Sequence, residues 1–236
     1  MAEYPTTERG GSDRHRDLVV IGGSAGCIEG LCKEVFPGLP EEFPAAICVV
    51  LHMSPQSPRV LDAIWGRNSR LPVQYALNGA ALLPGQIYIA PPGYHLLVAG
   101  SKLALNRGPH ENLHRPAGDP LFSSAAEAYG ERVVGVVLTG NLDDGTRGSR
   151  AVKERGGVVV VQDPRDALYR SMPESVLRHV GADHCLPMSQ LAPLLVRLTQ
   201  EKLSTTIRED PAGRTAKSTN ARDSACYSCQ GSWGEG

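Results

Sequence analysis

Four short runs rich in valine, isoleucine and leucine alternate with segments of helical pattern, and this alternation limits the possible folds more than any other feature. The runs occupy residues 18–21, 46–51, 133–138 and 158–161. Near-continuous apolar runs are typical of buried strands in parallel sheets, and strands that alternate with helices indicate βαβ units. The sequence therefore predicts an α/β fold: a doubly wound, mostly parallel sheet with helices on both faces.

Six further segments carry helical patterns, and several of them open on Ser or Pro, as helices often do. They are residues 25–35, 59–67, 120–128, 147–155, 173–180 and 189–201. Residues 73–106 differ, because Pro84-Gly85 leads into the run 86–90 and Gly100-Ser101 separates two short apolar runs. Turn residues between short runs are typical of antiparallel hairpins. We therefore expect an antiparallel hairpin insertion in this section.

The two ends of the chain differ in composition from its middle. From about residue 204 onward the chain is rich in Ser, Thr, Arg, Asp and Gly and has little apolar content. Such a segment cannot bury enough apolar surface to offset the entropy lost on ordering. We therefore expect disordered segments at residues 1–16 and 204–236, on either side of one folded domain at residues 17–203.

Charge and hydropathy exclude several classes of protein. Lysine and arginine total 24 against 25 acidic residues, so the chain has no electrostatic basis for binding nucleic acid. No apolar run approaches the roughly 20 residues of a membrane-spanning helix, and the polar residues 1–16 do not resemble a secretory signal. We therefore expect a cytoplasmic protein with no membrane span and no nucleic-acid partner.

The cysteines argue against a disulfide scaffold. Four of them lie singly in apolar segments, as reduced cysteines do in cytosolic proteins: Cys27, Cys32, Cys48 and Cys185. Cys226 and Cys229 form a lone C-x-x-C pair, which is weak evidence for zinc without a second pair or a spaced pair of histidines. We expect two free thiols there, and neither a metal site nor a cofactor.

The segment Gly22-Gly23-Ser24-Ala25-Gly26 lies where the first predicted strand ends and the first predicted helix begins. Glycine on both sides of a serine allows a sharp turn from which the hydroxyl projects and backbone N–H groups are free to donate. This is the shape of a nucleophile elbow. A serine at such a turn is also a common helix N-cap, and the pentapeptide alone does not decide between the two.

Polar side chains follow two further predicted strands. His52 follows the run 46–51, and both Asp143 and Asp144 follow the run 133–138. The carboxyl ends of parallel strands lie at one edge of a sheet, where functional groups gather. Serine is a poor nucleophile unless a base such as histidine, with an ordinary pKa of about 6.5, takes its proton and a carboxylate orients that base. Ser24, His52 and one of the two aspartates are therefore candidates for a catalytic triad.

Two other interpretations of the glycine-rich turn remain open. In an ordinary α/β-hydrolase the acid and then the histidine follow the nucleophile, so Ser24, Asp144 and His184 would form the triad. That fold places its nucleophile after several strands, whereas Ser24 follows the first. A phosphate-binding turn is the second alternative, but the segment matches neither G-x-G-x-x-G nor G-x-x-x-x-G-K-[ST].

Several ordered blocks carry a resemblance to a known family over about residues 17–198. They are residues 21–26, residues 51–53, His114-Arg115-Pro116 with Asp119 and Leu121-Phe122, residues 138–140 with 144–145, and residues 162–164 with Met172-Pro173. With these blocks the chain resembles the catalytic domain of the bacterial chemotaxis protein-glutamate methylesterases (CheB-type). The resemblance implies that residues 17–203 form a methylesterase catalytic domain.

The resemblance also implies roles for three residues: Ser24 as nucleophile, His52 as general base and then acid, and Asp144 as orienting carboxylate. The implied reaction is hydrolysis of glutamate methyl esters on the cytoplasmic helices of chemoreceptors, through an acyl-serine intermediate and with release of methanol. Family members also deamidate receptor glutamines. Only about 16 residues precede the first strand, too few for a receiver domain, so a separate receiver protein is a further candidate partner.

The chain departs from the family pattern at the turn. Ala25 stands where several members carry threonine, and Cys27 stands where the family has a second glycine. A catalytically weak scaffold that binds receptors or signalling partners is therefore an alternative function. Residues 107–119 are expected to form an irregular loop at the mouth of the site, where His114 and Arg115 hold the receptor segment or serve only to anchor the loop.

Overall fold

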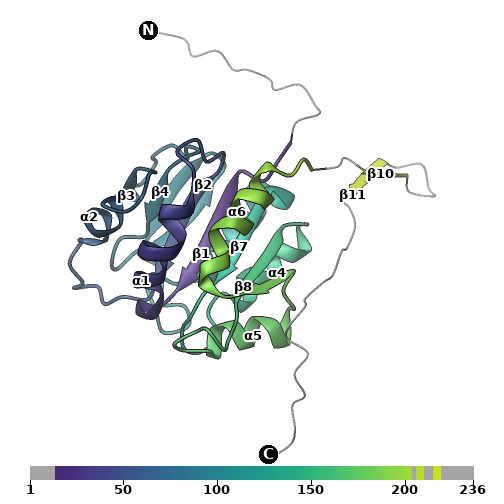
Figure 1. Cartoon of the computed structure of the whole chain (residues 1–236). Helices are drawn as coiled ribbons and strands as arrows, with labels where there is room; N and C mark the ends of the chain where they lie inside the picture. Colours follow the sequence, from purple (N-terminus) through teal and green to yellow (C-terminus); the bar gives the residue numbers. More distant parts are fainter. Residues whose placement is uncertain (1–13, 204–205, 210–214, 219–236) are drawn as a thin grey trace, which may run out of the picture.

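A seven-stranded sheet forms the centre of the protein (Figure 1). The structure is a computed structural model that describes residues 14–203, 206–209 and 215–218. All strand pairs of this sheet are parallel. In spatial order the strands are β3 (Val73–Tyr75), β4 (Ile87–Ile89), β2 (Ala46–Leu51), β1 (Leu18–Gly23), β7 (Val133–Val137), β8 (Val158–Gln162) and β9 (His184–Leu186). The predicted mostly parallel α/β sheet is confirmed.

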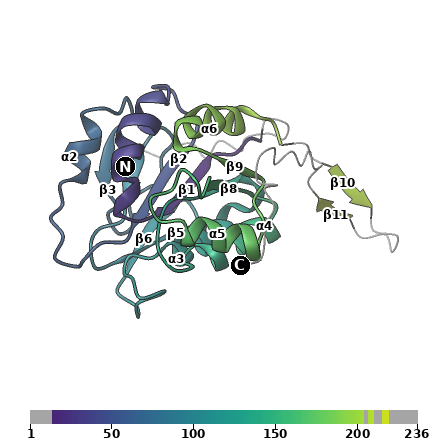
Figure 2. The same ribbon diagram turned by 60° about the horizontal axis from the view of Figure 1, so that its bottom comes forward.

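Helices cover both faces of the sheet, because successive side chains of each strand point to opposite faces. Val19 and Ile21 of β1 join one buried cluster, whereas Leu18 and Val20 join the other. The first cluster is covered by η1 (Ala25–Cys27), α1 (Ile28–Gly30), η2 (Leu31–Val35), η3 (Phe36–Gly38), α2 (Leu61–Gly66), η5 (Met188–Gln190) and α6 (Leu191–Gln200). Figure 2 shows α6 on one side of the sheet and α3 and α5 on the other.

The second cluster lies beneath three helices and a hairpin. They are α3 (Gly118–Tyr129), which η4 (Gly130–Arg132) follows, α4 (Thr146–Glu154), α5 (Ser171–His179), and the antiparallel strands β5 (His95–Ala99) and β6 (Lys102–Asn106). The predicted hairpin insertion is thus present. The valine-rich strands are apolar on both faces, so both faces of the sheet must be covered by helices. This requirement produces the doubly wound arrangement.

One part of the hairpin prediction is wrong. The run 86–90 was expected to belong to a hairpin, but β4 pairs in parallel with both β2 and β3 inside the main sheet. All three residues of β4 are buried, as a central parallel strand requires. The connection across residues 76–86 is long enough for the crossover that parallel neighbours need. The turn at Pro84-Gly85 therefore ends that crossover rather than a hairpin.

The chain changes direction between β1 and β7. From β1 it runs outward through β2 to β3 and β4, and it then crosses back to β7 and runs outward on the other side through β8 to β9. Loops on either side of such a switch point diverge and leave a crevice outside the carboxyl ends of the strands, where ligands bind. Figure 2 turns this edge of the sheet toward the viewer.

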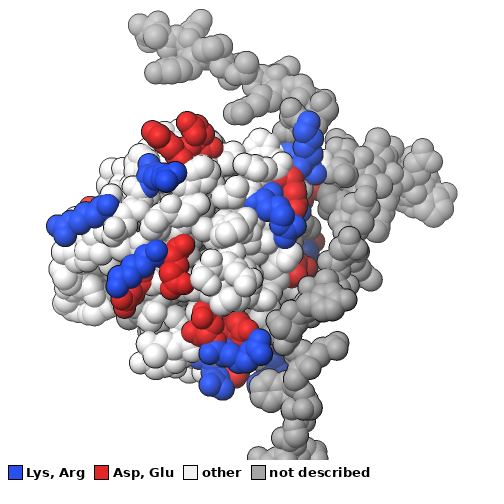
Figure 3. Space-filling model, viewed as in Figure 1, with Lys and Arg blue, Asp and Glu red and all other residues white. Residues whose placement is uncertain are grey.

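The segments expected to be disordered, residues 1–16 and 204–236, lie mostly outside the described residues. In the part of the second segment that the structure describes, β10 (Thr206–Glu209) and β11 (Thr215–Ser218) pair antiparallel in a separate two-stranded sheet. Among the described residues, no helix is both long and apolar enough to cross a bilayer. On the face that Figure 3 shows, basic and acidic side chains are interspersed and form no continuous basic surface.

Gly148 of α4 tests how tightly α3 and α4 pack. A Cβ at this position would lie 2.5 Å from Cβ of Phe122 and 3.2 Å from the backbone of Asp119. Although alanine favours helix over glycine by about 1 kcal/mol, we expect Gly148→Ala to lower the free energy of unfolding by about 1–3 kcal/mol. Urea unfolding measures the change. Gly66→Ala in α2 is the matched control, because nothing lies within 4 Å there; equal stabilities of the two variants would contradict the prediction.

Candidate active site

Ser24 lies at a sharp turn directly after β1. Its backbone N–H donates to the Thr139 carbonyl (2.9 Å), and its own carbonyl accepts from the N–H of Cys27 (3.0 Å) and from the Cys27 thiol (2.9 Å). A Cβ on Gly23 would lie 2.7 Å from Sγ of Cys27, so the turn requires glycine there. The turn holds Ser24, which is partly exposed, at the carboxyl edge of the sheet.

His52 and Asp144 come together in the interior beside this turn. His52 follows β2, and its backbone N–H donates to the carbonyl of Gly23 (3.0 Å), so the ends of β1 and β2 are joined. Nε2 of His52 lies 2.7 Å from Oδ2 of Asp144, and the two side chains are only 5% and 1% exposed. The structure thus pairs the predicted base with one of the two candidate carboxylates.

Ser24 and His52 line one cavity of about 450 Å³. The other lining residues are Met53, Ser54, Pro55, His110, Leu113, His114 and Arg115. Within the described part of the chain, no hydrogen bond joins the Ser24 hydroxyl to His52. Catalytic hydrogen bonds are often long in unliganded enzymes and tighten when substrate binds. The arrangement brings a serine hydroxyl and an imidazole to the same solvent-accessible space.

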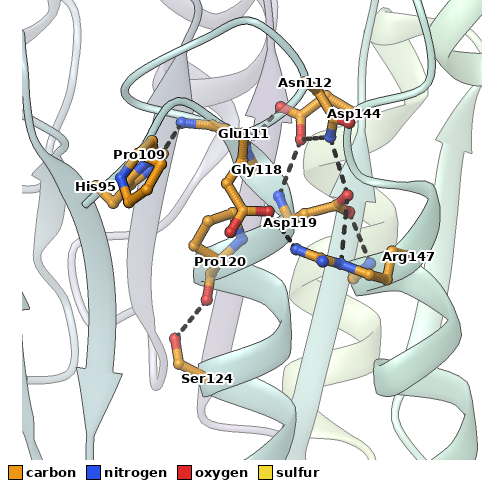
Figure 4. Close-up of polar contacts among 12 residues, drawn as sticks. His95, Pro109, Glu111, Asn112, Gly118, Asp119, Pro120, Ser124, Asp144 and Arg147 are labelled. Carbon is orange, nitrogen blue, oxygen red and sulfur yellow. Dashed lines mark hydrogen bonds and ion pairs between the residues drawn. The ribbon is translucent and has the colours of Figure 1, made fainter. Parts of the chain in front are cut away.

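Four donors converge on the carboxylate of Asp144, and Figure 4 shows Asn112, Gly118 and Asp119 around it. Besides His52, the backbone N–H groups of Gly118 (2.6 Å) and Asp119 (3.0 Å) and the amide of Asn112 (2.9 Å) donate to it. Burial alone would raise the pKa of Asp144, but the hydrogen bonds from His52, Gly118 and Asn112 outweigh burial and lower it to about 2. Asp144 is therefore ionised at neutral pH and can only accept, so Nε2 of His52 is the donor in this pair.

The other candidate residues lie elsewhere. Asp143 is exposed and borders a separate cavity beside Arg147 and His179. His184 lies on β9, which β7 and β8 separate from β1, and in the described residues no hydrogen bond links it to Asp144. The alternative α/β-hydrolase triad is therefore not assembled.

The loop of residues 107–117 contains groups that the sequence did not reveal. Asn112 donates to Asp144 and also to Oδ2 of Asp119 (2.9 Å). His95, which the sequence left as an ordinary histidine, is buried; its Nε2 donates to the Pro109 carbonyl (2.8 Å) and its Nδ1 accepts from the N–H of Ala117 (3.3 Å) (Figure 4). These contacts fix the loop beside the His52–Asp144 pair.

Asp119 is a second buried carboxylate beside the first. Its Oδ1 accepts from the N–H of Gly148 (2.7 Å), and Nε of Arg147 lies 3.8 Å from its Oδ2. Burial raises the pKa of Asp119, and the nearby charge of Asp144 adds to that increase. Asn112 bridges the two carboxylates and so reduces their repulsion.

Large apolar side chains remain exposed on several loops at the carboxyl edge, and we refer to four of them as the apolar rim. They are Leu113 (79% exposed), Leu142 (49%), Leu168 (69%) and Tyr169 (46%). Leu113 lines the cavity, and Leu168 lies next to the turn, since a Cβ on Gly26 would lie 3.1 Å from its Cδ2. Clustered exposed apolar residues typically mark a binding surface.

A comparison with family models matches residues 19–195 to the CheB methylesterase domain. The chain belongs to the CheB methylesterase family. Among curated relatives, a putative protein-glutamate methylesterase/protein-glutamine glutaminase of Leptospira interrogans is 36% identical over 188 residues, which cover 79% of this chain and 97% of that protein. Protein-glutamate methylesterase/protein-glutamine glutaminase 4 of Geobacter metallireducens is 36% identical over 186 residues, which are 78% of this chain and 53% of that protein.

A solved structure supports the same assignment. The crystal structure of the Thermotoga maritima CheB methylesterase catalytic domain matches with a TM-score of 0.73 and 36% identity, over 77% of this chain and 98% of that one. The chain therefore has the fold of a CheB catalytic domain and spans about half the length of the longer relatives it matches.

In the described part of the chain, no group of three or more His, Cys, Asp or Glu side chains is arranged to hold a metal ion. Cys27, Cys32 and Cys48 are free thiols, whereas Cys226 and Cys229 lie outside the described residues.

Asp144 and its neighbour Asp143 allow a matched test of how much the buried carboxylate stabilises the fold. We expect Asp144→Ala to lower the free energy of unfolding at pH 7 by about 1–3 kcal/mol, because it leaves buried donors unpaired. The folded pKa of about 2 lies below the ordinary 3.8, so the carboxylate stabilises the fold fully above about pH 4 and loses that effect as the pH falls toward 2. The difference in free energy of unfolding between wild type and Asp144→Ala, measured by urea unfolding, should therefore become smaller as the pH falls from about 4 to about 2.

Asp143→Ala is the control, because that side chain is exposed and its loss should change stability by no more than about 0.5 kcal/mol. Equal destabilisation by the two substitutions would show that the donors around Asp144 do not stabilise the fold in this way.

Proposed function

We propose that this chain hydrolyses γ-methyl esters of glutamate on chemoreceptor helices, with Ser24 as nucleophile, His52 as general base and Asp144 as orienting carboxylate. The observation that carries the proposal is the buried His52–Asp144 pair, 2.7 Å apart, beside the same cavity that Ser24 lines. The names of the curated relatives, protein-glutamate methylesterase/protein-glutamine glutaminase, support the choice of substrate. Since the methylated receptor helices are cytoplasmic, the proposed site of action is the cytoplasm.

In the first half-reaction, Oγ of Ser24 attacks the ester carbonyl carbon while Nδ1 of His52 takes the hydroxyl proton. Asp144 stabilises the resulting imidazolium through Nε2. The first N–H groups of a helix have no partners within it, so those at the start of η1 are suited to stabilise the developing oxyanion. Collapse of the tetrahedral intermediate breaks the bond to the methoxy oxygen, and His52 returns the proton to it, which releases methanol.

In the second half-reaction, water attacks the acyl-serine while His52 takes one of its protons. The bond between the acyl carbon and Oγ then breaks, and His52 returns that proton to Oγ. The products are a receptor carboxylate and the free hydroxyl of Ser24. The same sequence on a glutamine side chain releases ammonia in place of methanol, so one site serves both ester and primary amide substrates.

Ser24→Ala tests the nucleophile directly. We expect methanol release from methylated receptor membranes to fall by roughly 10⁴-fold or more, because no acyl-serine can form. Ser101→Ala is the matched control, because Ser101 lies exposed in the turn between β5 and β6. A fluorophosphonate reagent should label the wild-type peptide at Ser24. Unchanged methanol release by a folded Ser24→Ala protein would contradict Ser24 as the nucleophile. No methanol release above background by the wild-type protein would favour the receptor-binding scaffold.

The apolar rim predicts a difference between large and small substrates. We expect Leu113→Ser and Leu168→Ser each to raise KM for methylated receptor about fivefold, which corresponds to about 1 kcal/mol of lost apolar contact, with kcat unchanged. KM for a small glutamate γ-methyl ester should not change. Leu83→Ser is the control: Leu83 is 50% exposed but precedes β4 and so lies toward the opposite edge of the sheet. An equal rise in KM for the small ester would show that the rim does not contact the receptor.

A further inference from the structure

His114 lies flat against the proposed base. The two imidazole rings have their centroids 3.7 Å apart and their planes inclined by only 7°. His52 follows β2, whereas His114 belongs to the loop before α3, so the stack joins two segments far apart in the sequence. At this separation the rings are in van der Waals contact, and His114 lies over one face of the His52 imidazole.

A tight turn presents His114 to His52. Glu111 and His114 exchange two backbone hydrogen bonds (3.0 and 2.9 Å). The two residues between them, Asn112 and Leu113, have φ values of +48° and +67°, as in type I′ turns. Asparagine tolerates this conformation, but for leucine it is unfavourable. Such conformations persist where the surroundings hold the backbone in place, and they cluster at functional sites.

The side chains of the turn anchor it to the carboxylate that binds His52. Asn112 donates to both Asp144 and Asp119 at 2.9 Å, and Glu111 forms an ion pair with Arg147 of α4 (Figure 4). Asp144 therefore holds His52 through one oxygen and the turn that carries His114 through the other. The position of one ring is thus defined relative to that of the other.

On the basis of the proposed function, we propose that His114 is a positioning residue, whose ring keeps Nδ1 of His52 directed toward Ser24. A hydrogen bond to Asp144 fixes the position of Nε2, but a single contact leaves the ring free to tilt about it. The flat face of His114 removes this freedom. Misplacement of a catalytic group by about 1 Å can cost about a hundredfold in rate, so the stack has a direct effect on turnover.

The charge of His114 is compatible with this role. Burial lowers the pKa of His114, and His52 lowers it further; Asp144 opposes the shift and His110 adds to it. His52, Asp144 and His110 are the titratable neighbours that act on the ring, and Arg115 is adjacent to it in the chain. A lowered pKa favours the neutral form of His114, so the stack is compatible with an imidazolium at His52.

The test compares three substitutions of His114, which distinguish the effect of a flat ring from the effect of side-chain volume. We expect His114→Ala and His114→Leu to lower kcat roughly tenfold to a hundredfold with KM changed less than twofold, whereas His114→Phe stays within about threefold of wild type because its ring still stacks. The rate at which a fluorophosphonate modifies Ser24 should fall in the same order. Thermal unfolding of each variant shows that it is folded, and His179→Phe, at an exposed position, is the matched control.

Two outcomes would overturn the positioning role: kcat for His114→Leu equal to wild type, or kcat for His114→Phe as low as for His114→Ala. Methanol release by the wild-type protein tests the proposed function separately. If the wild type releases methanol and the Ala and Leu variants match it, the positioning role is wrong and the function stands. If it releases none, yet modification of Ser24 still depends on a flat ring at residue 114, the substrate assignment is wrong and the positioning role stands.

Discussion

The buried carboxylate of Asp144 is the point on which the arrangement of the site depends. Its two oxygens accept from the imidazole of His52, from the amide of Asn112, and from the N–H groups of Gly118 and Asp119. The last two are the first residues of α3, so Asp144 satisfies backbone donors that have no partner within the helix and places a negative charge at its N-terminus, where the helix dipole favours one. One carboxylate thus fixes the His52 ring, the start of a helix and the turn that carries His114. The same donors stabilise its ionised form and compensate for its burial.

Backbone hydrogen bonds extend this arrangement across the strand ends. His52 donates to Gly23, and Ser24 donates to Thr139, whose own N–H donates to the side chain of Gln162 at the end of β8. The loops after β2, β1, β7 and β8 are therefore linked in spatial order along one edge of the sheet. A site built on linked strand ends holds its groups more accurately than one on free loops.

Much of the fold could be predicted from the sequence, because its central strands are apolar on both faces and their runs are continuous. Residues 46–51 are predicted and observed as β2 with the same bounds. The placement of β4 could not be predicted, since a three-residue strand has no periodicity and its neighbours are set by tertiary pairing. His52 and Asp144 could be selected because both follow strong strands. Asn112 could not, because its contact with Asp144 depends on a left-handed backbone at two non-glycine residues, which no local pattern indicates.

At Cys27, where the chain departs from the family pattern, the side chain adds a second contact to the turn. The thiol is fully buried, and burial raises its pKa to about 12, so it stays neutral and does not compete with Ser24, the proposed nucleophile. Its Sγ lies 2.9 Å from the carbonyl oxygen of Ser24, which the Cys27 N–H also approaches. A glycine at this position would donate through its N–H alone. The second donor therefore restrains the peptide group that follows Ser24, which is the one whose N–H opens η1 and is suited to stabilise an oxyanion.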